Sequence, residues 1–480
     1  MPKKTEAREV TLTDLIDGQK IGLRLSLLVL VAMLVLISDG FDLASIGYVV
    51  PELLKHWHIK REALTPALTA GTVGLLLGAP LLSFAGDRYG RKVAILSGLA
   101  FFGLMSLLTG FAMTLTQITA LRFLTGIGLG GVIPNIVALV SEFAPRRLRG
   151  RCLVLVTFGV ALGIALAGRV AAAFVPEFGW QVLMVVGGVS PLLLIVIVHF
   201  AVPESIKYLA ERGDKDAQVR RLASDLRPDM DIDDNTQLIV PTVSAPSVRG
   251  SPKQLFEGGL LVITPLLWIA QATNQVANFF SLTWLPTLLQ ATGSSTQQAG
   301  AINSWFSFGG MIGGLCLMFT IDRVGTLPLV ILFVLGTPLV GILTLGGLSS
   351  SEQTLVFAGA GFCVVGLQMG ITAVQGMIYP TPVRSTGAGW CQAAGRIGAI
   401  VAPLGGGALL AARVPIPQLS HYAAALMGIG AVACITLALL CIRRLGGYQL
   451  KEFHTRVEGA PRVAASRSPL STSPPAAESR

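Results

Sequence analysis

The chain has 480 residues, of which 52% are hydrophobic and 13% are charged, whereas soluble proteins carry about 25% charged residues. Together with long uncharged runs, this composition excludes a water-soluble globule and indicates an integral membrane protein. The formal net charge of +10 does not indicate nucleic-acid binding, because the basic residues lie between apolar runs and form no compact basic unit.

A polar, cytoplasmic segment is predicted for residues 1–24. The apolar run that follows is too long for a secretory signal and lacks a small-residue cleavage site, so it should remain as a membrane helix. Each apolar run of the first half has roughly the 20 residues that a helix needs to cross a bilayer core. The six predicted spans are residues 25–50, 64–85, 93–111, 118–140, 153–175 and 182–202.

The second half repeats this plan after a polar central loop over residues 204–257. Its predicted spans are residues 260–289, 302–319, 327–345, 354–378, 388–411 and 423–442. The fold class is therefore all-α and polytopic, with twelve transmembrane helices in two six-helix bundles over residues 25–203 and 258–444. A tail rich in Pro, Ser and Ala, residues 445–480, is predicted to be disordered.

The basic residues of the loops predict the orientation of the chain, because Lys and Arg favour the cytoplasmic side. Outside the spans, the side opposite the N-terminus carries only Lys55, Lys60, Arg61 and Arg413. We therefore expect both termini and the central loop to be cytoplasmic.

Two short matches relate the halves to each other. Residues 87–90 (DRYG) after the second span match residues 322–325 (DRVG) after the eighth. Residues 145–150 (PRRLRG) after the fourth span align with residues 382–387 (PVRSTG) after the tenth. Equivalent positions indicate two parallel six-helix repeats, with a substrate site between them near the membrane midplane.

Two acids in the first span, Asp39 and Asp42, are three residues apart and share one helical face. A carboxylate at mid-bilayer depth costs about 2.5–3.5 kcal/mol on insertion scales. Burial and mutual repulsion favour the protonated form of at least one acid. The pair is therefore predicted to load and release protons, and the alternative is a structural hydrogen bond between helices.

Three arginines fall within predicted spans. Arg396 is predicted to offer its guanidinium fork to a substrate carboxylate, or to hold an aspartate in one state of a cycle. Arg122 is predicted to belong to a coupling or gating network, and either arginine could instead form a structural ion pair. Arg169 is predicted to extend to the outer surface.

An aromatic ligand would need flat apolar contacts, and Phe41, Trp284 and Trp390 are the predicted substrate contacts. Phe279, Phe280 and Trp305 also lie in spans that could face the cavity, and each of these rings could instead serve packing or anchor the protein at the membrane interface. Amide side chains within the spans could read ring hydroxyls, or equally join helices. These amides are Asn274, Gln275, Asn278, Asn303, Gln368, Gln375 and Gln392.

A charged cytoplasmic turn contains Asp87, Arg88 and Arg91, and Glu142 lies near the inner end of the fourth span. Such charges could hold one conformation closed. The six cysteines show no metal-ligand or disulfide spacing. The spans contain no nucleophile and base set, so we expect no enzyme and no metal site.

Residues 86–92 (GDRYGRK) resemble the loop signature of the major facilitator superfamily, and Arg122 followed by three glycines resembles its fourth-helix signature. Further segments resemble the aromatic acid:proton symporter family in both halves. They are residues 39–42 (DGFD), 134–135, 141–142, 284–289 (WLPTLL), 379–387 and 395–400 (GRIGAI). The second-half loop departs from the pattern, with Thr326 and Leu327 where the first half has Arg91 and Lys92.

The resemblance implies a major facilitator fold and a proton-coupled symporter that imports a carboxylate of the 4-hydroxybenzoate, protocatechuate or benzoate type by alternating access. It implies a bacterial inner membrane, a proton gradient in place of a cofactor, and no nucleic-acid or obligate protein partner. Two alternatives remain open from the sequence: a symporter for a non-aromatic organic acid, and a membrane sensor of aromatic acids that does not transport them.

Overall fold

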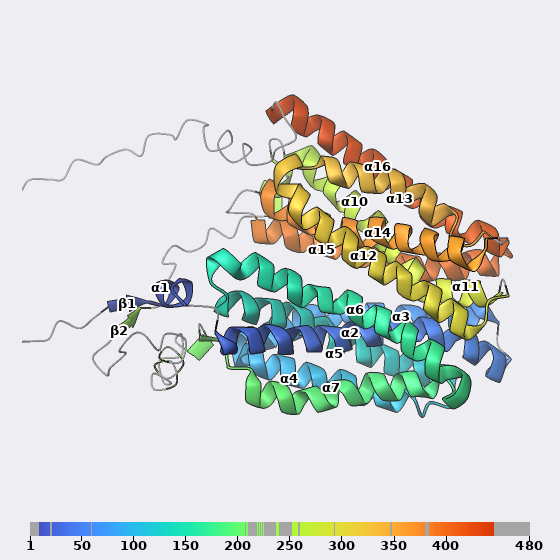
Figure 1. Ribbon diagram of the computed structural model, residues 1–480, viewed down its shortest axis with the longest axis horizontal. Coiled ribbons are helices and arrows are strands. Elements are labelled where there is room, and N and C mark those ends of the chain that lie inside the picture. Colours follow the sequence, from blue (N-terminus) through green and yellow to red (C-terminus); the bar gives the residue numbers. More distant parts are fainter. Residues whose placement is uncertain are drawn as a thin grey trace, which may run out of the picture.

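The computed structural model describes residues 9–19, 22–58, 60–206, 208–209, 218, 220, 222, 224, 237–239, 252–257, 260–291, 293–345, 348–379 and 384–445. Long helices dominate these residues and gather into two bundles (Figure 1). Eleven of the described helices are long and apolar enough to cross a membrane. Residues 446–480 of the predicted tail and much of the predicted central loop lie outside the described residues.

The first bundle contains six helices, one for each span predicted in this half. They are α2 (Leu23–Trp57), α3 (Thr65–Tyr89), α4 (Arg91–Thr109), α5 (Leu115–Phe143), α6 (Arg146–Phe178) and α7 (Gln181–Ala201), with a short 3-10 turn, η1 (Arg61–Leu64), before α3. Several helices extend beyond the predicted apolar runs, because their polar first and last turns reach past the bilayer core.

Among the described residues, the second bundle has an element for each of its six predicted spans, and five of these are long and apolar enough to cross a membrane. The six elements are α10 (Leu260–Thr283) with α11 (Leu285–Ala291), α12 (Thr296–Val324), α13 (Leu327–Gly341), α14 (Ser350–Ile378), α15 (Arg384–Ala411) and α16 (Ile416–Leu445), and the 3-10 turn η2 (Pro252–Phe256) comes before α10. The helix α13 has 15 residues, about 22 Å at 1.5 Å per residue. It ends at Gly341, short of the predicted residue 345.

The seventh predicted span, residues 260–289, is not one continuous helix. It breaks at Trp284, between α10 and α11. Pro286 lacks the N–H that would continue the hydrogen-bond ladder to the Leu282 carbonyl, which accounts for the break. The Trp284 side chain is fully buried, and its Nε1 donates to the Pro403 carbonyl of α15 at 3.2 Å.

Glycines let equivalent helices approach closely in both halves. A Cβ at Gly74 of α3 would meet the Phe123 carbonyl of α5, and a Cβ at Gly313 of α12 would meet the Phe362 carbonyl of α14. Small residues at helix interfaces are typical of membrane bundles, where packing replaces the hydrophobic effect. Since α3 and α5 are the second and fourth spans, and α12 and α14 the eighth and tenth, this pairing agrees with the predicted repeat.

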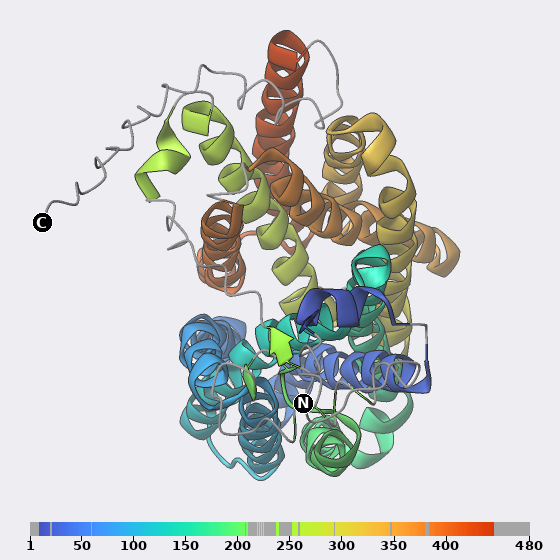
Figure 2. The same cartoon turned by 90° about the vertical axis from the view of Figure 1, so that its left-hand side faces the viewer.

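The bundles meet each other at the end of the molecule remote from the N-terminus, where α11 lies in Figure 1. Glycines face each other there, because Gly300 of α12 lies against the Gly168 carbonyl of α6. Hydrogen bonds that join the bundles include those from Asn303 Nδ2 to Tyr48 Oη (2.8 Å), from Thr296 Oγ1 to Glu52 Oε1 (3.2 Å) and from Ser304 Oγ to the Ala165 carbonyl (3.2 Å). Figure 2 shows the two groups of helices from the opposite end.

The N-terminal segment docks on the first bundle. The strand β1 (Glu9–Thr11) pairs in parallel with β2 (Gln237–Ile239) of the central loop, and α1 (Leu12–Asp17) follows it. Leu15 is fully buried. Gln19 Nε2 donates to the Phe143 carbonyl at 2.5 Å, so the segment is tied to the end of α5.

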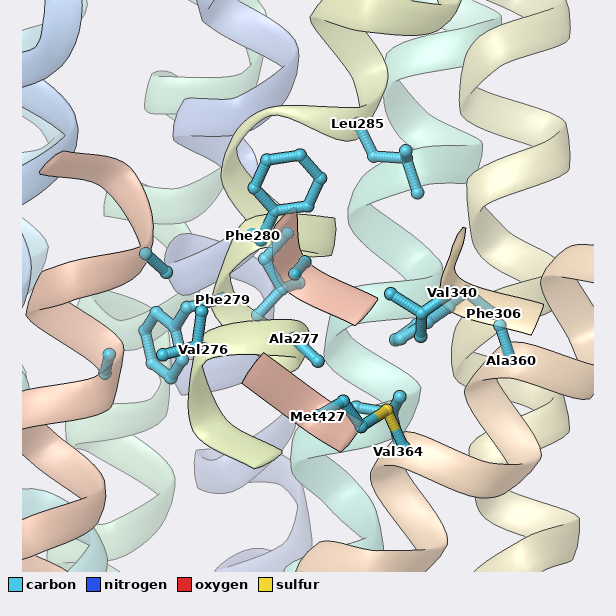
Figure 3. Close-up of a cluster of buried hydrophobic side chains, with 14 of the residues drawn as sticks. Val276, Ala277, Phe279, Phe280, Leu285, Phe306, Val340, Ala360, Val364 and Met427 are labelled. Atoms are coloured by element: carbon cyan, nitrogen blue, oxygen red, sulfur yellow. The ribbon is translucent and has the colours of Figure 1, made fainter. Parts of the chain in front are cut away.

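The apolar core of the second bundle draws on several helices. Figure 3 shows Ala277 of α10, Phe306 of α12, Val364 of α14 and Met427 of α16 within one cluster, all of them buried. This cluster continues into the first bundle through side chains such as Tyr48, so the apolar core bridges the two halves.

Candidate functional site

Asp42 is held by a complete set of partners inside the first bundle. Its side chain is 0% exposed, and Arg122 of α5 is 3% exposed. Arg122 Nη1 lies 2.9 Å from Asp42 Oδ2, and Arg122 Nη2 donates to the Asp42 main-chain carbonyl at 3.3 Å. Ser106 of α4 donates to Asp42 Oδ1 at 2.5 Å. The buried carboxylate is therefore paired and hydrogen-bonded on both oxygens, as a stable buried charge requires.

Asp39 stands in a different environment, near the midpoint of α2. Its side chain is 2% exposed, yet its Oδ1 has no hydrogen-bond partner. Asp42 acts on it electrostatically from one turn away, and Arg396 acts on it from α15 of the second bundle. The arrangement brings a predicted proton-coupling acid and a predicted substrate-binding arginine together across the boundary between the halves.

A cluster of amides lies beside Arg396, where α10, α14 and α15 meet. Gln271 Nε2 donates to Gln368 Oε1 at 3.4 Å and to Gln392 Oε1 at 3.2 Å. Gln392 precedes Arg396 by one turn on α15, and Gly395 lies against the Gln271 side chain. The sequence singled out Gln368 and Gln392 but not Gln271, although Gln271 shares a helical face with Asn274 and Gln275.

The three predicted ring-contacting residues do not gather around Arg396. Phe41 lies against Gly187 of α7, within the first bundle. Trp284 packs on Gly406, ten positions beyond Arg396 and thus about 15 Å along the α15 axis. Trp390 is 49% exposed and stacks on Trp268, with ring centroids 5.8 Å apart. Their contact with a substrate stays a prediction.

The charged residues at the N-terminal end of α4 form contacts with α5. Arg91 Nε lies 3.7 Å from Glu142 Oε1, and Arg91 Nη1 donates to Asn135 Oδ1 at 3.4 Å. The Arg88 guanidinium lies over the Tyr89 ring, 5.7 Å from its centroid. The Asp87 side chain is outside the described part of the structure.

Glu204 also belongs to the charged residues at the N-terminal end of α4, although the sequence predicted it only as part of the central loop. Its Oε1 accepts hydrogen bonds from the backbone N–H groups of Lys92 (3.1 Å) and Ser205 (2.8 Å). Because Lys92 is in the first turn of α4, Glu204 caps that helix from a distance. Gly90 has φ 109° and makes room for the carboxylate, since a Cβ there would meet Glu204 Oε2. The sequence does place this acid just beyond the sixth predicted span, a position from which it could reach the cytoplasmic end of a neighbouring helix.

Arg169 of α6 is exposed, and its predicted extension to the outer surface stays a prediction. Within the described residues, no group of three or more His, Cys, Asp or Glu side chains could hold a metal ion.

Comparisons with known proteins agree with the fold. Residues 28–287 match the family model described as "Sugar (and other) transporter", and residues 267–475 match the one described as "Major Facilitator Superfamily". A D-xylose–proton symporter structure aligns with a TM-score of 0.65 at 16% identity, covering 86% of this chain and 97% of that one. An inward-open structure of the xylose transporter XylE from E. coli aligns with a TM-score of 0.62 at 15% identity, covering 89% and 99%.

Curated relatives have a higher sequence identity to this chain than these solved structures have. The 4-hydroxybenzoate transporter PcaK of Pseudomonas aeruginosa is 34% identical over 387 residues, which is 80% of this chain and 86% of the relative. A gallate transporter of Pseudomonas putida is 32% identical over 95% of this chain and 98% of the relative. A benzoate transport protein of Acinetobacter baylyi is 30% identical over 85% and 88%.

Proposed function

Because this chain belongs to the aromatic acid:proton symporter family of the major facilitator superfamily, we propose that it imports an aromatic carboxylate such as 4-hydroxybenzoate together with protons, by alternating access. It is an integral membrane protein and a transporter, not an enzyme. The observation that carries the proposal is the placement of Asp39, buried with an unpartnered oxygen, opposite Arg396 of the other bundle.

The substrate carboxylate competes with Asp39 for Arg396. A guanidinium binds a carboxylate through two parallel hydrogen bonds, which suits an anionic substrate better than an ammonium would. When the substrate takes Arg396, Asp39 loses its opposite charge at mid-bilayer depth. A carboxylate there is costly unless it is neutralised, so Asp39 takes up a proton as the substrate binds. Binding and protonation are thereby coupled.

Asp42 and Arg122 complete the coupling network in a supporting role. Their ion pair joins α2 to α5 one turn from Asp39, and Ser106 fixes the carboxylate from α4. We therefore assign the moving proton to Asp39 and the maintenance of the site's charge to Asp42.

Alternating access requires the two bundles to part at one end while they close at the other. The bundles are joined at the end remote from the N-terminus. At the other end, Arg91, Glu142 and Glu204 form contacts within the first bundle. We assign these charges, together with Asp87 and Arg88, to a network that stabilises one conformation of the cycle.

The proton gradient is the proposed energy source, and no cofactor is needed. Import of an anion into a negative-inside cell costs about 2.3 kcal/mol per charge per 100 mV, which one proton offsets. The bacterial inner membrane, with both termini cytoplasmic, is the proposed location. The charge distribution of the loops and the bacterial origin of the relatives support it.

Uptake of labelled 4-hydroxybenzoate into liposomes containing the protein tests the function. We expect accumulation against a concentration gradient when the outside is acidic, and loss of that accumulation when an uncoupler is added. Uptake that ignores the proton gradient would contradict symport. Absence of uptake of any aromatic acid would contradict the proposal as a whole, and binding without uptake would indicate a sensor.

A further inference from the structure

We propose that the buried amides beside Arg396 bind the ring hydroxyl of the substrate, so that the protein selects hydroxylated aromatic acids over unsubstituted ones. This inference rests on the proposed import of aromatic acids. The amide cluster consists of Gln271, Asn274 and Gln275 of α10, Gln368 of α14 and Gln392 of α15.

The α10 members of the amide cluster are buried but incompletely hydrogen-bonded. Gln271 and Asn274 are fully buried, and Gln275 is 9% exposed. Gln271 Oε1, Asn274 Oδ1 and Gln275 Oε1 have no hydrogen-bond partner. The amide nitrogens of Gln271 and Asn274 donate over 3.2 to 3.5 Å to Gln368 and Gln392. Buried polar groups are normally satisfied, so several open positions side by side indicate a place for a polar ligand group.

The chemistry of an amide selects a hydroxyl over a carboxylate at this place. Each amide offers a carbonyl acceptor and N–H donors, and a hydroxyl both donates and accepts. A hydroxyl therefore complements the amide cluster whichever way each amide is turned. A carboxylate only accepts, so it complements an amide through the N–H groups alone, and the unpartnered carbonyl oxygens of this cluster would repel it. The cluster thus favours the neutral, hydroxyl-bearing end of a substrate and leaves the charged end to Arg396.

The spacing between Arg396 and the amide cluster fits one aromatic ring. Gln392 and Arg396 are four residues apart on α15, a rise of about 6 Å along the axis. That rise is comparable to the length of a benzene ring with substituents at opposite ends. Gly395 lets Gln271 approach α15 closely, because a Cβ there would lie 2.9 Å from Gln271 Nε2.

The amide cluster also has an accessible side. Gln368, Gln392 and Arg396 are only partly buried, in contrast to Gln271 and Asn274. Gln392 Nε2 reaches the exposed Thr372 at 3.5 Å. A ligand that approaches from this side meets the half-buried groups first, and its hydroxyl ends against the fully buried ones.

The test compares uptake of 4-hydroxybenzoate and benzoate by the full-length protein in proteoliposomes. We expect the wild type to transport 4-hydroxybenzoate at least about tenfold more efficiently, since one net hydrogen bond is worth about a factor of ten. Gln392→Leu and Gln271→Leu should lower that preference about tenfold through weaker 4-hydroxybenzoate uptake, with benzoate uptake retained. Gln418→Leu, at an exposed position in the first turn of α16, is the matched control and should keep the wild-type preference.

The outcomes separate this inference from the proposed function. Equal transport of both acids by the wild type would overturn the hydroxyl readout and leave aromatic acid import intact. Parallel loss of both acids in Gln392→Leu, with normal folding by thermal unfolding, would also overturn it, because the amide would then serve the site as a whole. Transport of neither acid by the wild type would overturn the proposed function itself.

Discussion

Asp39 and Asp42 illustrate how two identical side chains on one helical face acquire different properties. Asp42 has an ion pair with Arg122 and a hydrogen bond from Ser106. Asp39 has an unpartnered oxygen and depends on Arg396 from the other bundle for opposite charge. Asp42 is fixed within one bundle. The electrostatic environment of Asp39, in contrast, changes whenever the two bundles move relative to each other.

Asp39→Asn should uncouple transport from the proton gradient. The amide is neutral at every pH, so substrate binding no longer brings a proton with it. We expect the variant to exchange labelled for unlabelled 4-hydroxybenzoate across liposome membranes but not to accumulate it with an imposed proton gradient. Gradient-driven accumulation at the wild-type level would remove Asp39 from the coupling role.

Asp42→Asn should instead destabilise the fold. It leaves the Arg122 guanidinium buried without its carboxylate, and breaking a buried pair in this way costs about 3–5 kcal/mol. Thermal unfolding in detergent should show a clear fall in the transition temperature.

The double variant Asp42→Asn with Arg122→Gln is the control, because it removes both charges together. It should recover much of the lost stability. Equal stability of Asp42→Asn and the wild type would show that the ion pair contributes little.

Charged residues of the candidate site are easier to recognise in the sequence than its neutral ones. Asp39, Asp42, Arg122 and Arg396 are conspicuous because charges are costly in apolar spans. Gln271 went unnoticed, because a single amide in a span costs little and its partners on α14 and α15 come from remote parts of the chain. Packing of α10 against α14 and α15 brings Gln271 to these partners, and a local sequence pattern does not predict that packing.

Among the elements, α4 depends on a cap that comes from beyond α7. Glu204→Gln keeps the size of the side chain but removes the negative charge from the N-terminus of α4. The amide oxygen can still accept the backbone hydrogen bonds, but loss of a negative charge at a helix N-terminus costs about 0.3–1 kcal/mol, so the unfolding temperature in detergent should fall slightly. Glu177→Gln, exposed near the end of α6, is the matched control and should unfold like the wild type. Identical unfolding of the two variants would contradict the capping role.

The contact between α2 and α6 depends on Gly40, within the motif that carries both acids. A Cβ at this position would overlap the Val160 carbonyl. Gly40→Ala should therefore destabilise the protein by about 1–3 kcal/mol through overpacking.

At Gly405 of α15 a Cβ would meet nothing within 4 Å, so Gly405→Ala provides the control. It should be neutral or slightly stabilising, because alanine is the better helix former. The yield of folded protein and the unfolding temperature measure both effects. A stable, active Gly40→Ala variant would show that α2 can move away from α6 without loss.

At the level of elements, apolar runs predicted where helices occur but not where they bend or stop. Hydropathy does not change at Trp284, so residues 260–289 looked like one span. The break depends on Pro286 and on the hydrogen bond from Trp284 to α15, which is a tertiary contact. The short β1 and β2 pair was also missed, since three residues on each side carry no recognisable alternation.

For the molecule as a whole, the contacts between the bundles must break once in each transport cycle. We expect a covalent link there to stop transport. Glu52→Cys with Thr296→Cys places two thiols where α2 and α12 are hydrogen-bonded. A short bifunctional thiol reagent should abolish uptake of 4-hydroxybenzoate, and a cleavable form of the reagent should allow recovery after reduction. Each single cysteine variant should tolerate the same treatment. Undiminished uptake by the cross-linked protein would place the moving contact elsewhere.

The two-bundle architecture itself could be predicted, because the loop motifs repeat after equivalent spans. The relation between the bundles could not. The hydrogen bond of Asn303 with Tyr48, and the electrostatic interaction of Asp39 with Arg396, join positions that are far apart in the sequence and share no motif. Such pairings depend on which conformation of the cycle the molecule adopts, and a sequence encodes all of those conformations at once.

The pairing of β1 with β2 changes the length of the tether between the halves. The connection from α7 to α10 is the single covalent link, and β2 fixes a point within it to the strand that precedes α1. The strand is anchored to the first bundle by α1 and Gln19, and η2 is held on α10 by the hydrogen bond from Thr264 Oγ1 to the Leu255 carbonyl, so the connection between these two anchors runs only from Ile239 to Pro252 in the sequence. A shorter connection raises the effective concentration of one bundle around the other. The N-terminal segment thus shortens the covalent connection between the two bundles.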